Sequence, residues 1–409
     1  MTVVFDRPYQ FVPPHRGKFW PAVIQRLRLV DSYLKWKEGV VSCECRDLHH
    51  LRESLDRGHG ILLAPNHCRY ADPLVLGWPA RELRTNVYAM ASWHLFNKGR
   101  FDGFAIQKMG GFSIHREASD RQALDTAIGI LATAERPLVL FPEGTTNRSN
   151  DVLKPLLDGV SFIARAAARR REKKSNGQVV MHPVGIKYLC TEDIHPWADE
   201  QLSVMEQRLG WQKSPKISIL QRTERLIKGI FVLREVQYLG DVGSGTLTQR
   251  RDALIAEILL RIESRLELES KDDDIRNRVR VIRSAVSARF FQSDATIEPD
   301  EDIQLKQDVV AADLVQEMVS TPESYLQADQ VTDTRIVETI QGMQDALLGK
   351  ASCSVPLRAV IQFGEAIRVP AEKAPRDRDD PLMVQLQDRL SVMLEMLSRD
   401  ASAISDDHL

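Results

Sequence analysis

The sequence predicts an α/β fold: a central sheet flanked by helices, with an N-terminal amphipathic helix and a large helical insertion before the last strand. Short apolar runs alternate with helical patterns over residues 40–187, as in α/β layer folds. Strand patterns are nearly absent from residues 190–349, where long helical patterns follow one another. A strand pattern returns at residues 357–363, so we expect the helices to interrupt one α/β domain.

The composition is that of a globular protein. The chain has 409 residues, of which 43% are hydrophobic and 27% charged, enough for one large domain or two ordinary ones. A net charge of −2 provides no overall basic field, so no nucleic-acid partner is expected. The five cysteines are scattered, and no Cys/His set has zinc spacing, which predicts no metal site and a reducing compartment.

The N-terminus lacks a basic region followed by an apolar core, so no signal peptide is expected. No apolar run approaches the ~20 residues that span a bilayer. The expected location is therefore the cytoplasm, either in solution or peripheral on the membrane. Residues 18–37 form a predicted amphipathic helix with Trp20 and Trp36 near its ends. Such a helix can pack on a core or lie in a membrane interface, and both interpretations stay open.

The elements after this helix follow from hydrophobic periodicity. The predicted strands are residues 40–45, 61–64, 86–91, 112–114, 138–141 and 179–186. The predicted helices between them are residues 47–56, 73–83, 119–134 and 160–174. Residues 61–64 are apolar throughout and are bounded by polar turns, which indicates a buried strand.

The insertion is predicted to be helical, with a weak strand signal at residues 217–220. Its helical patterns cover residues 249–268, 274–292, 303–319 and 334–348, and an acidic linker covers residues 294–302. The second helix is basic, and its arginines can pair with preceding acids or form a second interfacial surface. These arginines are Arg276, Arg278, Arg280, Arg283 and Arg289. The predicted segments are residues 1–39, 40–189, 190–352 and 353–409, the last completing the α/β domain with a strand and a helix.

Four strand ends carry polar groups. Asn66 and His67 follow residues 61–64, and Asp72 comes five residues after the histidine. An aspartate can hold one imidazole nitrogen protonated and leave the other to act as a base. The other ends carry Gly110-Gly111 with Arg116, Glu143-Gly144-Thr145, and His182-Pro183. Because ligands bind at the carboxyl ends of strands in open α/β sheets, we expect these groups to converge on one site.

The sequence resembles the glycerolipid acyltransferases of the lysophosphatidate and glycerol-3-phosphate type. Their four blocks are present in order as NHCRYAD, GGFSIHR, FPEGTTNR and HPVGIKY, and LRAVIQFGEAI resembles the strand that closes the family's domain. The resemblance implies a mixed central sheet. It also implies transfer of a fatty acyl group from acyl-CoA or acyl-carrier protein to a lysophospholipid or to glycerol phosphate. The acceptor that it implies most strongly is 1-acylglycerol-3-phosphate. It implies a membrane-surface enzyme without a cofactor.

The resemblance also implies roles for the residues of these blocks. His67 would be the general base, Asp72 would orient it, and Glu143 would belong to the same catalytic cluster. Arg116 would hold the acceptor phosphate through charge-assisted hydrogen bonds. Gly110 and Gly111 would allow the backbone to approach closely. The backbone amides of Gly144 and Thr145 could donate hydrogen bonds to the substrate phosphate or to the developing oxyanion. The implied substrate-binding residues are Asn66, Gly110, Gly111, Arg116, Gly144, Thr145 and Arg148.

Two positions depart from the family pattern. Arg69 stands where a serine is more common, and we expect its side chain to point to solvent or to substrate phosphate. Thr146 takes the place of an arginine, and Arg148 follows two residues later. Members that use lysophosphatidylcholine-type acceptors show a similar ending, so the acceptor headgroup stays open. A non-catalytic lipid-binding protein and an acyl-thioester hydrolase are the alternative functions.

Overall fold

The structure is a computed structural model. It describes residues 8–117, 120–146, 148–175, 177–212, 217–269, 274–292, 298–320, 323–326, 331–351, 355–374 and 379–404. Part of the predicted acidic linker at residues 294–302 lies outside these ranges. None of the helices in the described residues is long and apolar enough to cross a membrane.

The strands form one mixed sheet in the order β1-β7-β6-β2-β5-β3-β4, with β8 paired to β6. Neighbours are parallel except where β6 meets β7 and β8. The prediction of a mixed central sheet flanked by helices is therefore confirmed. The strands are β1 (Val40–Arg46), β2 (Gly60–Pro65), β3 (Tyr88–Ser92), β4 (Gly111–Ile114), β5 (Leu138–Val139), β6 (Val179–Cys190), β7 (Leu357–Phe363) and β8 (Ile367–Arg368).

Strand β7 lies inside the sheet, between β1 and β6. The helices of the insertion leave at the end of β6 and return at the start of β7, where Cys190 pairs with Leu357. The amide of Thr191 also donates to the carbonyl of Pro356 at 3.1 Å. The two ends of the insertion are thus adjacent, and the sheet requires the segment that follows the insertion.

Helices precede and connect the first strands. They are α1 (Phe19–Arg26), α2 (Leu29–Tyr33), a π-helical turn (Leu34–Glu38), α3 (His49–Asp56), α4 (Asp72–Val75), α5 (Gly77–Glu82), α6 (His94–Asn97), α7 (Arg100–Lys108), α8 (Arg121–Thr133) and α9 (Gly159–Ser175). The single helix predicted at residues 18–37 is wrong. Arg28 has a left-handed backbone with a φ of 50°, and this conformation cannot continue a right-handed helix.

The insertion contains α10 (His195–Arg208), α11 (Ile219–Leu239), α12 (Leu247–Arg265), α13 (Ile275–Gln292), α14 (Pro299–Ser320), a short 3₁₀ helix (Glu323–Leu326) and α15 (Asp333–Leu348). The weak strand predicted at residues 217–220 is instead a helix start. Ser218 and Gln221 form a reciprocal capping box at the N-terminus of α11, which satisfies two backbone donors that a helix start otherwise leaves unpaired.

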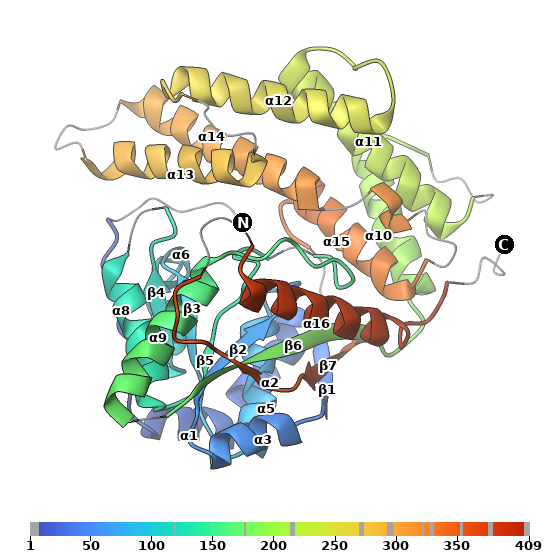
Figure 1. Cartoon of the computed structure of the whole chain (residues 1–409). Helices are drawn as coiled ribbons and strands as arrows, with labels where there is room; N and C mark the ends of the chain where they lie inside the picture. The colour runs from blue at the N-terminus through green and yellow to red at the C-terminus, as the bar shows by residue number, and fades with distance from the viewer. Residues whose placement is uncertain are drawn as a thin grey trace.

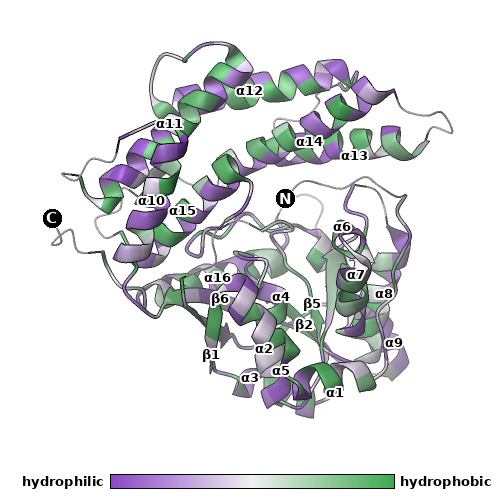
Figure 2. Cartoon of the chain, turned by 180° about the vertical axis from the view of Figure 1, so that it is seen from behind, coloured by the Kyte–Doolittle hydropathy of each residue, from purple (hydrophilic) through white to green (hydrophobic). Residues whose placement is uncertain are grey.

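The two faces of the sheet belong to different cores. Leu62 and Ala64 of β2 pack with α8, α9 and α16 (Pro381–Ser398), whereas Ile61 and Leu63 pack with residues of α3, α10 and α15. This division follows from the alternation of side chains along a strand. Helices α12, α13 and α14 form a separate core, stacked as a layer beyond the sheet (Figure 1). Hydrophobic residues predominate in the strands β1 and β2, whereas hydrophobic and hydrophilic residues alternate along the helices of the insertion (Figure 2).

Helix α16 depends on a buried ion pair. Asp380 accepts a hydrogen bond from the amide of Leu382 as the N-cap, and its carboxylate lies 2.6 Å from Arg165 of α9. We expect Asp380→Ala to lower the free energy of unfolding by about 3–5 kcal/mol, because Arg165 would remain buried without its partner. Urea denaturation measures this change. Asp388→Ala on the exposed side of α16 should have little effect, and equal stability of both variants would contradict the assignment.

Candidate active site

The turn after β2 is clamped to β6. The Asn66 side chain accepts a hydrogen bond from the amide of Ile186 at 2.7 Å and donates to its carbonyl at 3.0 Å. These two bonds occupy the amide group of Asn66 on the neighbouring strand. The sequence-based prediction placed Asn66 among the substrate-binding residues; in the structure its side chain holds the turn that carries His67.

His67 and Asp72 face each other within this turn. The Nδ1 atom of His67 lies 2.9 Å from Oδ2 of Asp72. That oxygen also accepts the backbone amide of Arg69 at 2.9 Å, and Oδ1 accepts the hydroxyl of Tyr188 at 2.7 Å. Because an ionised carboxylate can only accept, the proton lies on Nδ1 and Nε2 keeps its lone pair. His67 Nε2 makes no hydrogen bond among the described residues.

The surroundings of His67 favour the neutral imidazole. Its ring stacks on that of Phe141 with centroids 3.9 Å apart, and its side chain is only 10% exposed. Burial lowers the pKa of His67 below its ordinary value of 6.5, although the hydrogen bond and charge of Asp72 act in the opposite direction. A histidine with these properties can accept a proton at neutral pH.

Glu143 supports the backbone beneath this pair. One carboxylate oxygen accepts the amide of His67 at 2.7 Å, and the other accepts the amide of Lys154 at 3.1 Å. Burial raises the pKa of Glu143 to about 7, while these two amides lower it. Glu143 therefore connects the His67 turn to the loop that follows β5, and its contact with His67 is through the main chain.

Two cations flank the turn at Gly144 and Thr145. Arg116 is exposed and donates to the carbonyl of Gly144, and the Nζ atom of Lys154 lies 3.3 Å from Oγ1 of Thr145. Burial lowers the pKa of Lys154 to about 8. The amide of Gly144 donates to Phe141 at 3.1 Å, so this donor is occupied within the turn. Positive charge beside the His67 turn provides a place for an anionic substrate group.

The glycines of the second block shape the approach to β4. Gly110 has a φ of 98°, which favours glycine, and a Cβ atom there would lie 2.5 Å from the carbonyl oxygen of Val87. A Cβ on Gly111 would lie equally close to Ile106. Both positions therefore need glycine for the turn between α7 and β4. This turn positions the strand that leads to Arg116.

The insertion contacts the loop between Glu143 and Lys154. Arg148, predicted to bind substrate, forms an ion pair with Asp345 of α15 at 2.5 Å. The amide of Asn150 donates to Glu338 of the same helix at 3.1 Å. Asp151 pairs with Arg335 at 2.8 Å and with the fully buried Lys187 of β6. Helix α15 thus holds the loop that supports the candidate active site.

The expectation for Arg69 is wrong. Its side chain is buried, with the guanidinium 5.3 Å from the ring centroid of Tyr188. The charge of Arg69 also lowers the pKa of Glu338, which burial raises to about 7. The side chain points inward because the insertion covers this side of the turn and supplies an opposite charge, a neighbour that local sequence does not reveal.

Sequence reasoning did not assign roles to Tyr188, Lys154 or Glu338. Tyr188 stands two residues after Ile186 in the fourth block, so strand alternation places both on the face that meets the His67 turn. The spacing of Tyr188 from Ile186 therefore indicates a place at the site. No sequence pattern indicates Glu338, because it lies far along the chain in an insertion whose packing depends on tertiary contacts.

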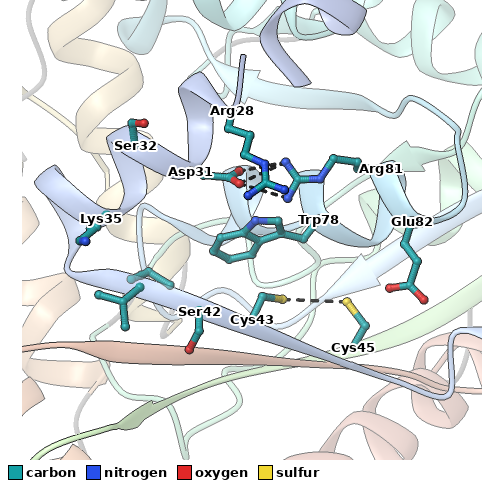
Figure 3. A pocket seen from close by; sticks show the side chains of 12 residues that line it. Arg28, Asp31, Ser32, Lys35, Ser42, Cys43, Cys45, Trp78, Arg81 and Glu82 are labelled. Atoms are coloured by element: carbon teal, nitrogen blue, oxygen red, sulfur yellow. Dashed lines mark hydrogen bonds and ion pairs between the residues drawn. The ribbon is translucent and has the colours of Figure 1, made fainter. Parts of the chain in front are cut away.

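A separate surface pocket of about 600 Å³ lies beside β1. Figure 3 shows Arg28 and Arg81 around Asp31, with Trp78, Cys43 and Cys45 nearby. It contains none of the predicted site residues, and the convergence of groups around His67 identifies the better candidate. Among the described residues, no group of three or more His, Cys, Asp or Glu side chains could hold a metal ion.

The comparisons with known proteins concern the part of the chain that contains these groups. Residues 45–187 match the family model described as Acyltransferase. The chain is also 33% identical over 110 residues to the 1-acyl-sn-glycerol-3-phosphate acyltransferase of Streptococcus pneumoniae. This alignment covers 27% of the chain and 38% of that relative. Both findings support the resemblance to glycerolipid acyltransferases.

The Tyr188 hydroxyl offers a test of this geometry. We expect Tyr188→Phe to lower the free energy of unfolding by about 1.5–3 kcal/mol, because Asp72 loses a hydrogen bond to a charged group. The less stabilised carboxylate should also raise the pKa of His67, as followed by NMR titration of the imidazole nitrogens.

Tyr325→Phe is the matched control for this test. The Tyr325 hydroxyl is also buried and donates to a carboxylate, that of Glu338 at 2.5 Å. Its removal should reduce stability without changing the pKa of His67. An identical response of His67 to both substitutions would contradict a specific role for Tyr188.

Proposed function

We propose that the chain, whose residues 45–187 match the acyltransferase family model, transfers a fatty acyl group from acyl-CoA or acyl-carrier protein to the hydroxyl of a lysophospholipid. The proposed acceptor is 1-acylglycerol-3-phosphate, with glycerol phosphate as a related candidate. The observation that carries the proposal is the pair of His67 and Asp72, in which the accepting nitrogen of a neutral imidazole is left for substrate.

The proposed reaction needs a base and no covalent enzyme intermediate. His67 Nε2 takes the proton of the acceptor hydroxyl as its oxygen attacks the thioester carbonyl. The tetrahedral intermediate then expels the thiolate, which receives the proton from the imidazolium. Asp72 stabilises the transient imidazolium because its carboxylate already accepts from Nδ1.

The cations beside the His67 turn support an acceptor that carries phosphate. Arg116 is exposed and can direct a guanidinium toward an anion, and Lys154 contacts Thr145 and Thr146 of the same turn. An arginine can form two parallel charge-assisted bonds with a phosphate. The acceptor phosphate would then be held next to the base, and its hydroxyl would be presented to Nε2.

We expect His67→Ala to reduce the rate of acyl transfer by roughly 10²–10⁴, because a positioned base contributes about that factor. The wild-type rate should fall as the pH decreases below 6.5, since the pKa of His67 lies under that value and the protonated imidazole cannot accept a proton. Thioester consumption and lipid products, measured with and without lysophosphatidate, report both effects.

The same products distinguish the alternatives. Free fatty acid in place of diacyl product would identify a thioester hydrolase, and no turnover with any acceptor would favour a lipid-binding protein. An unchanged rate in His67→Ala would contradict the proposed base. His195→Ala is a suitable control, because His195 lies in the insertion and pairs with Asp193.

The proposal places the protein on the cytoplasmic membrane surface as a peripheral enzyme. Phe19, Trp36 and Phe101 are 69%, 80% and 79% exposed in the N-terminal helices and α7. The rings of Trp20 and Phe104 pack 5.2 Å apart and join α1 to α7. Exposed aromatic rings near basic residues are typical of interfacial helices.

We expect Trp36→Ala combined with Phe101→Ala to weaken sedimentation with anionic liposomes at low salt, because these rings would insert at the acyl boundary. Leu260→Ala, at a side chain 60% exposed on α12 of the insertion, should leave binding unchanged. Failure of the unmodified chain to sediment would contradict the membrane proposal without affecting the proposed chemistry.

A further inference from the structure

Helix α13 of the insertion crosses the candidate active site at three contacts. Near its start, Arg276 donates to the carbonyl of Pro155 at 2.8 Å. Further along, Ser287 lies 3.5 Å from the imidazole of His115. Near its end, the ring of Phe291 packs 5.9 Å from that of Trp93. Pro155 follows Lys154 and His115 precedes Arg116, so the helix runs from one cation of the site to the other.

Arg283 must lie between the first two contacts. It is seven residues after Arg276 and four before Ser287, and these spacings place all three on one face of a helix. The face of α13 that meets the α/β domain therefore carries Arg276 and Arg283, between its contacts with Pro155 and His115. Burial is the main cause of the lowered pKa of Lys154, and the charges of both arginines lower it further, which agrees with this placement.

The nearby carboxylates do not use all the donors of this face. Asp313 of α14 pairs with Arg283. The charge of Glu317, on the same helix, raises the pKa of Lys154, which burial lowers. Glu117, beside Arg116, accepts from Trp93 and His94. A guanidinium has five N–H donors, and the Nε atom of Arg283 is buried without a hydrogen-bond partner in the described residues. Arg280, at the edge of the face, turns to Asn277.

We propose that Arg276 and Arg283 of the insertion, together with Lys154 and Arg116, bind a phosphate group carried by one of the two substrates. The inference rests on the proposed function for the identity of those substrates. The phosphate belongs either to the acyl donor, as in coenzyme A or the phosphopantetheine of a carrier protein, or to the glycerol phosphate of the acceptor. The insertion thereby contributes directly to substrate binding at the site that α15 supports.

Inorganic pyrophosphate is the probe that tests the site without turnover. In calorimetric titrations of the full chain, we expect Arg276→Gln/Arg283→Gln to bind pyrophosphate roughly tenfold to a hundredfold more weakly, because two charge-assisted contacts are lost. Arg289→Gln removes the same charge from another side of α13, where Arg289 faces Glu301, and should bind within about twofold of the unmodified chain. Arg276→Lys/Arg283→Lys should retain most of the binding.

Steady-state kinetics identifies which substrate supplies the phosphate. A higher KM for acyl-CoA in the glutamine variant, with no change for S-acyl pantetheine, which lacks every phosphate of the donor, would support the site and assign it to the donor. A higher KM for lysophosphatidate, with none for monoacylglycerol, would support it and assign it to the acceptor. Unchanged pyrophosphate affinity in the glutamine variant overturns the proposal. If no acyl transfer occurs, the proposed function fails, and the pyrophosphate titration still decides the site.

Discussion

The carboxylate of Asp72 is the group on which the rest of the site depends. It is fully buried, and a buried charge is costly unless its oxygens accept hydrogen bonds. Its three nitrogen and oxygen donors are the His67 ring, the amide of Arg69 and the hydroxyl of Tyr188. Two of these come from its own turn and one from β6. The turn can therefore hold its ionised aspartate only when β2 and β6 are aligned, and the clamp by Asn66 maintains that alignment.

The insertion is part of this arrangement. Its chain leaves and re-enters the sheet at one strand pair, and α15 packs in the same core as β6. Asp151 joins the active-site loop to Lys187 of β6, Arg335 of α15 and Ser398 of α16. A carboxylate shared by four elements connects the stability of the insertion to the position of the loop. Removal of the insertion would therefore expose charged groups that now satisfy one another, in addition to removing the proposed phosphate contacts of α13.

Several site residues were predictable from the sequence for a physical reason. His67, Glu143 and Arg116 each follow an apolar run, and the carboxyl ends of parallel strands meet at one edge of a sheet. Their convergence thus needs only the fold class. The fold class does not determine the direction in which a side chain points. Arg148 and Arg69 stand in the same blocks, but one pairs with Asp345 and the other is buried above Tyr188. Their partners are far along the chain, and no local pattern indicates them.

The α/β class, the approximate strands and helices, and the contact of His67 with Asp72 follow from local sequence, because hydrophobic periodicity and short spacings act over a few residues. Three features become visible only in the folded chain: β7 lies between β1 and β6, Arg28 breaks the N-terminal helix, and α13 faces the active site. Those features depend on which distant surfaces bury one another. The free energy of burial is gained only when two such surfaces meet, so a single stretch of sequence does not indicate which surfaces these are.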